Sequence, residues 1–188
     1  MRLVLATANP DKAVEIAAIF TAHQLLPRPP EVPDVDETEP TLEGNALLKA
    51  RALVRATSEA ALADDTGLEV NALGGAPGVR SARYAGEGAT YADNVAKLLE
   101  ELARFDDRRA RFRTVVAVAF PDGRELTAEG SVTGVIVDRP RGGGGFGYDP
   151  VFAPEGGGGR TFAEMDPESK HAISHRGRAL RAMAALLG

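Results

Sequence analysis

The sequence predicts an α/β fold built on a mixed β-sheet with helices interspersed. Short apolar runs typical of buried strands alternate with stretches whose apolar residues recur at helical spacing. Later in the chain, strand-like segments follow one another directly, so the pattern is not a plain repeat of strand, helix and parallel strand. A chain of 188 residues is most simply one domain, residues 1–188, and is long enough to bury a substantial core.

The first half of the chain is predicted from apolar periodicity and from capping residues. A Ser, Thr, Asp or Asn before an apolar helical pattern marks a helix start, and Thr41 has this position. The expected elements are, in order, a strand over residues 3–6, a helix around 14–20, a Pro- and acid-rich connection over 27–41, a helix after Thr41, a short strand that ends in a turn at 64–67, and a second short strand over 68–70.

The second half begins with a loop over residues 74–84, which either covers a site or makes a subunit contact. Thr90 and Asp93 have the spacing of a capping box, and Pro121-Asp122-Gly123 is typical of a hairpin turn. The expected elements are, in order, a helix after Thr90, strands over 112–120, 125–128 and 131–137, a glycine run at 142–145, a strand at 151–152, a mobile surface loop at the second glycine run 156–159, and a final helix after Ser174.

Composition excludes several classes of protein. The net charge of −5 argues against general binding to nucleic acid, and the absence of cysteine excludes disulfides and thiolate metal sites. The opening apolar run is too short for a signal peptide, and no stretch has the length of a transmembrane helix. We therefore expect no membrane association and a cytoplasmic location.

The adjacent carboxylates Asp64 and Asp65 are the most informative pair in the chain. Two carboxylates behind a buried strand need charge compensation, and a hard divalent cation such as Mg2+ provides it. The alternative for an isolated Asp-Asp-Thr-Gly sequence is a turn in which Asp65 or Thr66 caps backbone amides.

Two lysine-containing patterns indicate an anion site. Thr7, Asn9 and Lys12 follow the first strand and precede a helix, the arrangement that places amides and an ammonium beside a phosphate. The alternative is that Asn9 caps the helix. Lys49 lies four residues after Asn45, so both side chains share one helix face, although a solvated surface lysine is the common alternative.

The last third contains aromatic and basic residues suited to a base. Phe146 offers a flat face after the glycine run, although Phe146 and Tyr148 are also explained as core aromatics. His175 and Arg176 follow Ser174 at a helix start, where donors suit an anion or a carbonyl oxygen.

Taken together, six motifs resemble the inosine/xanthosine triphosphate pyrophosphatase family, whose members hydrolyse non-canonical purine nucleoside triphosphates to the monophosphate and pyrophosphate. The resemblance implies a homodimer of elongated, two-lobed α/β subunits with a central mixed sheet, an active-site cleft between the lobes, and a requirement for Mg2+. Gly44 departs from the pattern, since many relatives have Glu there. The motifs are Thr7-x-Asn9-x-x-Lys12, Asn45-x-x-x-Lys49-Ala50, Ala63-Asp64-Asp65-Thr66-Gly67-Leu68, Gly74-Gly75-x-Pro77-Gly78 with Ser81-Ala82-Arg83-Tyr84, Gly145-Phe146-Gly147-Tyr148-Asp149-Pro150, and Ser174-His175-Arg176-Gly177.

The resemblance also implies roles for individual residues. Asp65 is expected to be the proton acceptor and a metal ligand, with Asp64 and Glu37 as further metal ligands. Two rival interpretations are a non-catalytic nucleotide-binding module, which does not need the Asp pair, and a pyrophosphatase of modified pyrimidine nucleotides. The substrate-binding residues implied are Thr7, Asn9, Lys12, Lys49 and Thr66 near the phosphates, and Phe146, Gly147, Tyr148, Asp149, Lys170, His175 and Arg176 around the base.

Base preference follows from hydrogen-bond chemistry. Hypoxanthine and xanthine have an oxygen at position six, which His175, Arg176 or amides near Gly147 are expected to recognise, and Asp149 is expected to accept the ring N1 proton. The amino group of adenine would leave these donors unpaired, and sites of this kind discriminate by ~10^4-fold. We therefore expect ITP, dITP and XTP as substrates and strong rejection of ATP.

Overall fold

A computed structural model describes residues 1–188 of the chain. The structure divides into two compact units, each assembled from separate stretches of sequence. The first unit consists of residues 1–65, 114–130 and 176–188, and the second of residues 66–113 and 131–175.

The strands form one mixed sheet in the order β2-β1-β3-β5-β6-β7, and β4 pairs with β3. β1 is parallel to β2 and to β3, whereas β4 is antiparallel to β3 and β7 is antiparallel to β6. This arrangement confirms the prediction of an α/β fold with a mixed sheet. The strands are β1 Arg2–Leu5, β2 Gln24–Leu26, β3 Ala61–Val70, β4 Pro77–Gly78, β5 Arg109–Ala119, β6 Glu125–Ile136 and β7 Phe152–Pro154.

Helices flank the sheet, and none of them is long and apolar enough to cross a lipid bilayer. The predicted caps are present: Thr41 accepts the Gly44 N–H before α2, and Thr90 forms a capping box with Asp93 before α3. The helices are α1 Pro10–Ile19, α2 Leu42–Thr57, α3 Tyr91–Leu102, α4 Pro167–Ile173 and α5 His175–Leu187, with 3-10 turns at Asn71–Leu73, Ser81–Arg83 and Phe162–Glu164.

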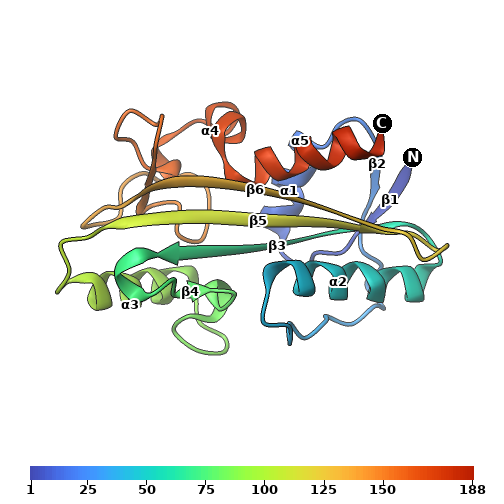
Figure 1. Cartoon of the computed structure of the whole chain (residues 1–188), viewed down its shortest axis with the longest axis horizontal. Helices are drawn as coiled ribbons and strands as arrows, with labels where there is room; N and C mark the ends of the chain where they lie inside the picture. The colour runs from blue at the N-terminus through green and yellow to red at the C-terminus, as the bar shows by residue number, and fades with distance from the viewer. The chain divides into compact units, whose positions relative to one another are not determined.

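In the first unit, α2 and α5 lie on opposite sides of the strands (Figure 1). The core on the α5 side joins α1, through Ile16 and Phe20, to α5, through Leu180 and Met183, over apolar strand residues such as Val116. The side chains named here are nearly or completely buried. This packing holds the ends of β1 and of the Asp-containing part of β3 in fixed positions.

In the second unit, α3 lies on one side of the strands and α4 on the other (Figure 1). Its core includes Leu98 from α3 and a group of aromatic rings, Phe112, Phe152 and Phe162. The rings of Phe112 and Phe152 meet edge to face, with centroids 4.7 Å apart. Ile173 of α4 packs against this core.

Two strand predictions are wrong in the same way. Residues 61–70 form one continuous strand, so no turn interrupts the chain at 64–67, and β6 likewise runs unbroken through residues 125–136. The Asp pair favoured a turn because charges are costly inside a sheet. In the structure, cations from other elements compensate these charges, and the strand continues.

Candidate functional site

Glu37 and Asp65 converge on one ammonium group in the first unit. Lys49 Nζ lies 2.9 Å from Glu37 Oε1 and 3.1 Å from Asp65 Oδ1. Lys49 comes from α2, Asp65 from β3, and Glu37 from the Pro- and acid-rich connection. The Lys49 side chain is only 13% exposed, so the surface-lysine alternative is wrong. The three residues whose grouping the resemblance implied are therefore in direct contact.

Asn45 links the Glu37 connection to the aspartate strand. Its amide group is almost fully buried, and its Oδ1 accepts the backbone N–H of Glu39 at 3.0 Å. Its Nδ2 points to Asp65 Oδ2 at 3.4 Å. Gly44 permits this approach, because a Cβ at that position would lie 2.7 Å from Glu39 Cβ. The departure from the family pattern at Gly44 thus coincides with close packing of the connection on α2.

Asp64 has cationic partners from two other elements. Arg176 Nε donates to Asp64 Oδ2 at 3.2 Å, and Lys12 Nζ lies 3.3 Å from the same oxygen. Arg176 NH1 also donates to Glu15 Oε2 from α1. Glu15, Asp64 and Arg176 are all buried. Sequence reasoning missed Glu15, whose only signal is an acidic residue three positions after Lys12 on the helix face.

The two adjacent aspartates have opposite pKa shifts. Burial raises the pKa of Asp65 against the charges of Lys49 and Lys12. Burial also disfavours the charged form of Asp64, but Lys12 and Arg176 outweigh it and hold its pKa well below the usual range. Burial lowers the pKa of Lys12. Burial acts in the same direction on Lys49, but the charges of Asp65 and Glu37, together with that of Asp64, outweigh it and raise the pKa of Lys49. Asp64 is thus held in its charged form, whereas burial favours the protonated form of Asp65.

Thr7 and Asn9 order the loop between β1 and α1. Asn9 Oδ1 accepts the N–H groups of Asp11 and Lys12 at 2.9 and 3.2 Å, so Asn9 is the N-cap of α1. Thr7 Oγ1 in turn accepts the Asn9 N–H at 3.1 Å. The capping alternative is therefore correct for Asn9. These contacts leave its predicted role toward phosphate untested.

The second unit assembles the other predicted residues around a buried ion pair. Lys170 Nζ lies 2.6 Å from Asp149 Oδ2, and both side chains are 5% exposed. The same carboxylate accepts the Phe146 N–H at 2.9 Å. Lys170 also lies over the Phe146 ring, 5.1 Å from its centroid. A Cβ at Gly145 would collide with the Asp149 carboxylate, so this position requires glycine.

Tyr148 and His175 are packed within the second unit. Tyr148 is buried, and its hydroxyl donates to the Ser81 carbonyl at 2.8 Å. The His175 ring is also buried and stacks on Phe112, with centroids 4.4 Å apart. Gly147 adopts φ +61, the left-handed region. The core-aromatic alternative therefore describes Tyr148, whereas Phe146 is half-buried.

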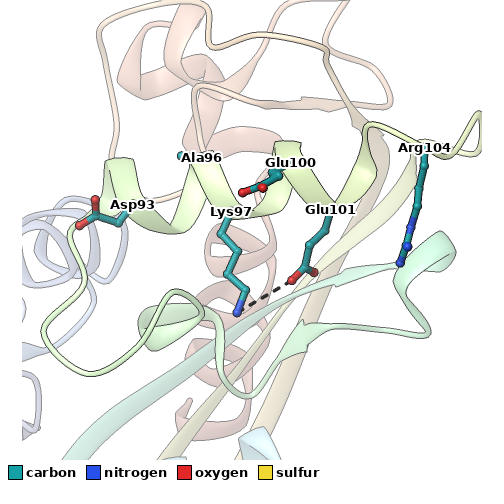
Figure 2. A pocket seen from close by; sticks show the side chains of 6 residues that line it. All are labelled: Asp93, Ala96, Lys97, Glu100, Glu101 and Arg104. Atoms are coloured by element: carbon teal, nitrogen blue, oxygen red, sulfur yellow. Dashed lines mark ion pairs between the residues drawn. The ribbon is translucent and has the colours of Figure 1, made fainter.

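Two hollows have been located on the units. One, of about 390 Å³, lies in the first unit beside Thr7 and is lined by Arg28, Asp34 and three prolines of the connection, Pro29, Pro30 and Pro33. The other, of about 600 Å³, follows the charged face of α3 in the second unit and is shown in Figure 2. There Lys97 pairs with Glu101, and none of the predicted site residues contributes to the lining. Of the predicted site residues, Thr7 lines the first hollow.

Glu37 and Asp65 are the carboxylates that could offer oxygen donors to a metal ion. No group of three or more acidic or histidine side chains is arranged to hold one. Glu37 and Asp65 nevertheless already share a single cation, the Lys49 ammonium. Mg2+ is commonly held by one or two carboxylates together with substrate phosphates. The oxygen donors present fit such a site.

The chain is similar to known proteins over nearly its whole length. The Ham1 family model matches residues 3–186. This chain belongs to the Ham1 family. It is 49% identical to the dITP/XTP pyrophosphatase of Chlorobaculum tepidum, over 99% of this chain and 92% of that protein, and 50% identical to the enzyme of the same name from Caulobacter vibrioides, over 99% and 97%.

Solved structures agree with the family assignment. A HAM1 protein from Coxiella burnetii has a TM-score of 0.90 and 42% identity, covering 100% of this chain and 98% of the other. The Ham1 protein of Staphylococcus aureus has a TM-score of 0.87 and 40% identity, with the same coverage. The family resemblance inferred from the motifs and the helix-flanked mixed sheet are both confirmed. The cleft between lobes stays a prediction.

Proposed function

We propose that this chain is a nucleoside-triphosphate pyrophosphatase that hydrolyses non-canonical purine nucleoside triphosphates, with ITP, dITP and XTP as substrates, to the monophosphate and pyrophosphate. The observation that carries the proposal is the convergence of Glu37, Asp65 and Lys49 in the first unit. Relatives that are about half identical over almost the whole chain are named dITP/XTP pyrophosphatases, which supports the same substrate class. In this proposal, residues 1–188 act as one enzymatic domain.

The metal that the family resemblance implies is Mg2+, held by Glu37 and Asp65. When bound, it would neutralise phosphate charge and lower the pKa of a coordinated water. Asp64 is the weaker candidate for a ligand, because Lys12 and Arg176 already share its carboxylate. In this proposal Asp64 holds Lys12 in place instead.

The residues of the chain divide the remaining work. Lys12 and Lys49 lie on the two sides of the Asp pair and would neutralise the triphosphate and the pyrophosphate leaving group. Asp65, whose pKa burial raises, accepts the proton of the attacking water at its carboxylate. Two neighbouring carboxylic acids whose environments shift their pKa values in opposite directions commonly have different roles in catalysis, one as a fixed charge and the other in proton transfer. The absence of cysteine rules out a thiolate nucleophile, and in this proposal water attacks the substrate directly.

The second unit supplies the base-binding residues in this proposal. Phe146 offers a half-buried ring, and Lys170 and Asp149 are held together beside it. The Asp149 carboxylate accepts the Phe146 N–H and the Lys170 ammonium within the protein, and in this proposal it also accepts the ring N1–H of the base. Arg176 is paired with Asp64 and Glu15, which makes His175 and backbone amides the better candidates for the six-oxo group.

The deciding experiment is a panel of ITP, dITP, XTP, GTP, ATP, CTP and UTP with Mg2+, scored for pyrophosphate release. We expect pyrophosphate, not orthophosphate, from ITP, dITP and XTP, and at least ~10^3-fold lower kcat/KM for ATP. Similar kcat/KM values for ATP and ITP would refute the proposed base selection. Release from a modified pyrimidine nucleotide alone would favour the pyrimidine alternative, and binding without turnover would favour a binding module. The homodimer and the cytoplasmic location remain predictions.

A further inference from the structure

Loop 141–150 carries Phe146 and Asp149, and backbone hydrogen bonds attach it to a neighbouring turn. The Arg141 N–H donates to the Pro150 carbonyl at 2.8 Å and closes the loop at its base. Midway along the loop, the Gly144 N–H donates to the Ala163 carbonyl at 3.0 Å. Ala163 returns a bond from its own N–H to the Asp149 carbonyl at 3.2 Å. The loop therefore lies against the 3-10 turn Phe162–Glu164.

The Arg141 side chain extends this attachment to the second glycine run. Its guanidinium donates to the Gly159 carbonyl at 2.7 Å, and its Nε lies 3.6 Å from Glu164 Oε2. The backbone carbonyl of Arg141 accepts the Thr161 hydroxyl at 2.9 Å. Thr161 also fixes Glu164 by donating its N–H to that carboxylate at 2.7 Å. One residue of loop 141–150 is thus joined to three points on residues 159–164.

Close packing explains two of the glycines in these runs. A Cβ on Gly142, at φ +83, would collide with the backbone of Ala163. A Cβ on Gly157 would lie 2.6 Å from Met165 Cε, and Gly157 is itself buried. Both positions require glycine because another segment approaches the backbone directly. The run at 156–159 is therefore packed at Gly157, whereas Gly156, Gly158 and Gly159 are exposed, as predicted for a surface loop.

We propose that Arg141 is a positioning residue for base selection, and that the turn at residues 156–159 is the anchor it uses. The proposal rests on the proposed function, because it concerns how loop 141–150 is held before a nucleotide arrives. Arg141 acts through Phe146 and Asp149, whose positions the loop determines. When the loop is already ordered before the nucleotide binds, no binding free energy is lost in ordering it. The expected result is tighter binding of the substrate and stronger discrimination between bases.

The test compares Arg141→Ala with Arg160→Ala. Arg160 is a matched control, because it is an arginine of the same turn whose Nε donates only within it, to Gly157 at 3.4 Å. We expect Arg141→Ala to raise KM for ITP ~10-fold, to reduce the ITP-over-ATP ratio of kcat/KM by a similar factor, and to leave kcat within ~3-fold. Arg141→Lys should recover part of the KM, and Arg160→Ala should stay within ~2-fold of the wild type.

A second measurement does not depend on turnover. Amide hydrogen exchange at Gly144 and Phe146 should be ~10-fold faster in Arg141→Ala than in the wild type or in Arg160→Ala. Equal exchange in the two variants, or a loss of kcat with unchanged KM, would overturn the proposal. If the wild type releases no pyrophosphate from any nucleotide, the proposed function fails by itself. In that case, amide hydrogen exchange and the calorimetric affinity of each variant for ITP would still show whether Arg141 positions loop 141–150.

Discussion

Replacing Arg176 by Met should be among the most destabilising single changes in the first unit. Its guanidinium lies between two buried carboxylates, Glu15 and Asp64, and its own side chain is 3% exposed. Met keeps much of the side-chain volume but removes the positive charge. Asp64 retains Lys12 at 3.3 Å, so the unfavourable burial falls mainly on Glu15. We expect protonation of Glu15 or entry of water to relieve only part of this cost.

The magnitude follows from the burial of the pair. Removing one partner from a buried ion pair costs about 3–5 kcal/mol, because the remaining charge is left uncompensated in a low dielectric. For a chain of this size each kcal/mol lowers Tm by roughly 2–4 °C, so the expected fall is roughly 6–20 °C. Urea unfolding at pH 7, followed by circular dichroism, measures the free energy of unfolding directly, and an unchanged m-value would show that the unfolding remains the same transition.

Arg51→Met is the matched control. Arg51 makes a two-pronged pair with Glu125, at 2.6 and 2.8 Å, but the two side chains are 46% and 32% exposed. An exposed pair contributes only about 0–1 kcal/mol. The double variant Arg176→Met/Glu15→Gln should recover about 1–3 kcal/mol relative to Arg176→Met, as expected for directly coupled groups. Equal losses in Arg176→Met and Arg51→Met would refute the reasoning that burial sets the cost.

Three further predictions concern catalysis, acid stability and assembly. Asp65→Asn should keep the fold and nucleotide binding but reduce kcat for ITP by at least ~100-fold; a mutant within a few-fold of the wild type would remove the assignment. Burial raises the pKa of Glu69, but bonds from Arg111 and Arg113 outweigh it and lower the pKa below 4.5. The ionised Glu69 carboxylate therefore stabilises the folded state above pH 4.5, and this stabilisation is lost as the pH falls through the lower pKa of the folded state. In urea unfolding, the free energy of unfolding of Glu69→Gln should differ from that of the wild type at pH 7, and much less so at pH 3. Light scattering at micromolar concentration should give about twice the chain mass of 19.7 kDa, whereas a monomer would remove the predicted homodimer.

Local sequence was sufficient for most helix starts and for part of the site. Thr41 and the Thr90–Asp93 box cap the helices that they were expected to cap, because capping depends on residues within one turn. The spacing of Asn45 and Lys49 was enough to place both on one face of α2, where both meet Asp65. The grouping of Glu37 with Lys49 came from the family resemblance, since the connection that carries Glu37 has no regular pattern.

Strand continuity was decided by the tertiary structure. From the sequence, two charges and a glycine at residues 64–67 predict a turn. A carboxylate with no partner nearby in the sequence is costly to bury in a sheet, so the strand is expected to end there. Lys12 from α1 and Arg176 from α5 reach Asp64, and Lys49 from α2 reaches Asp65. Compensation of this kind depends on which elements pack against β3, and no short window of sequence contains it.

The same reason explains the residues that sequence analysis missed. The ion pair between Glu15 and Arg176 joins positions 161 residues apart, and Arg141 reaches Gly159 across 18 residues. Each of these side chains, read alone, resembles an ordinary charged surface residue or a linker arginine. The sequence by itself determined the residue types, the capped helices and the family motifs. Only the tertiary structure decided which charges are buried together. A buried charge is tolerated when packing places an opposite charge within a few ångströms of it, and that partner can come from any part of the chain.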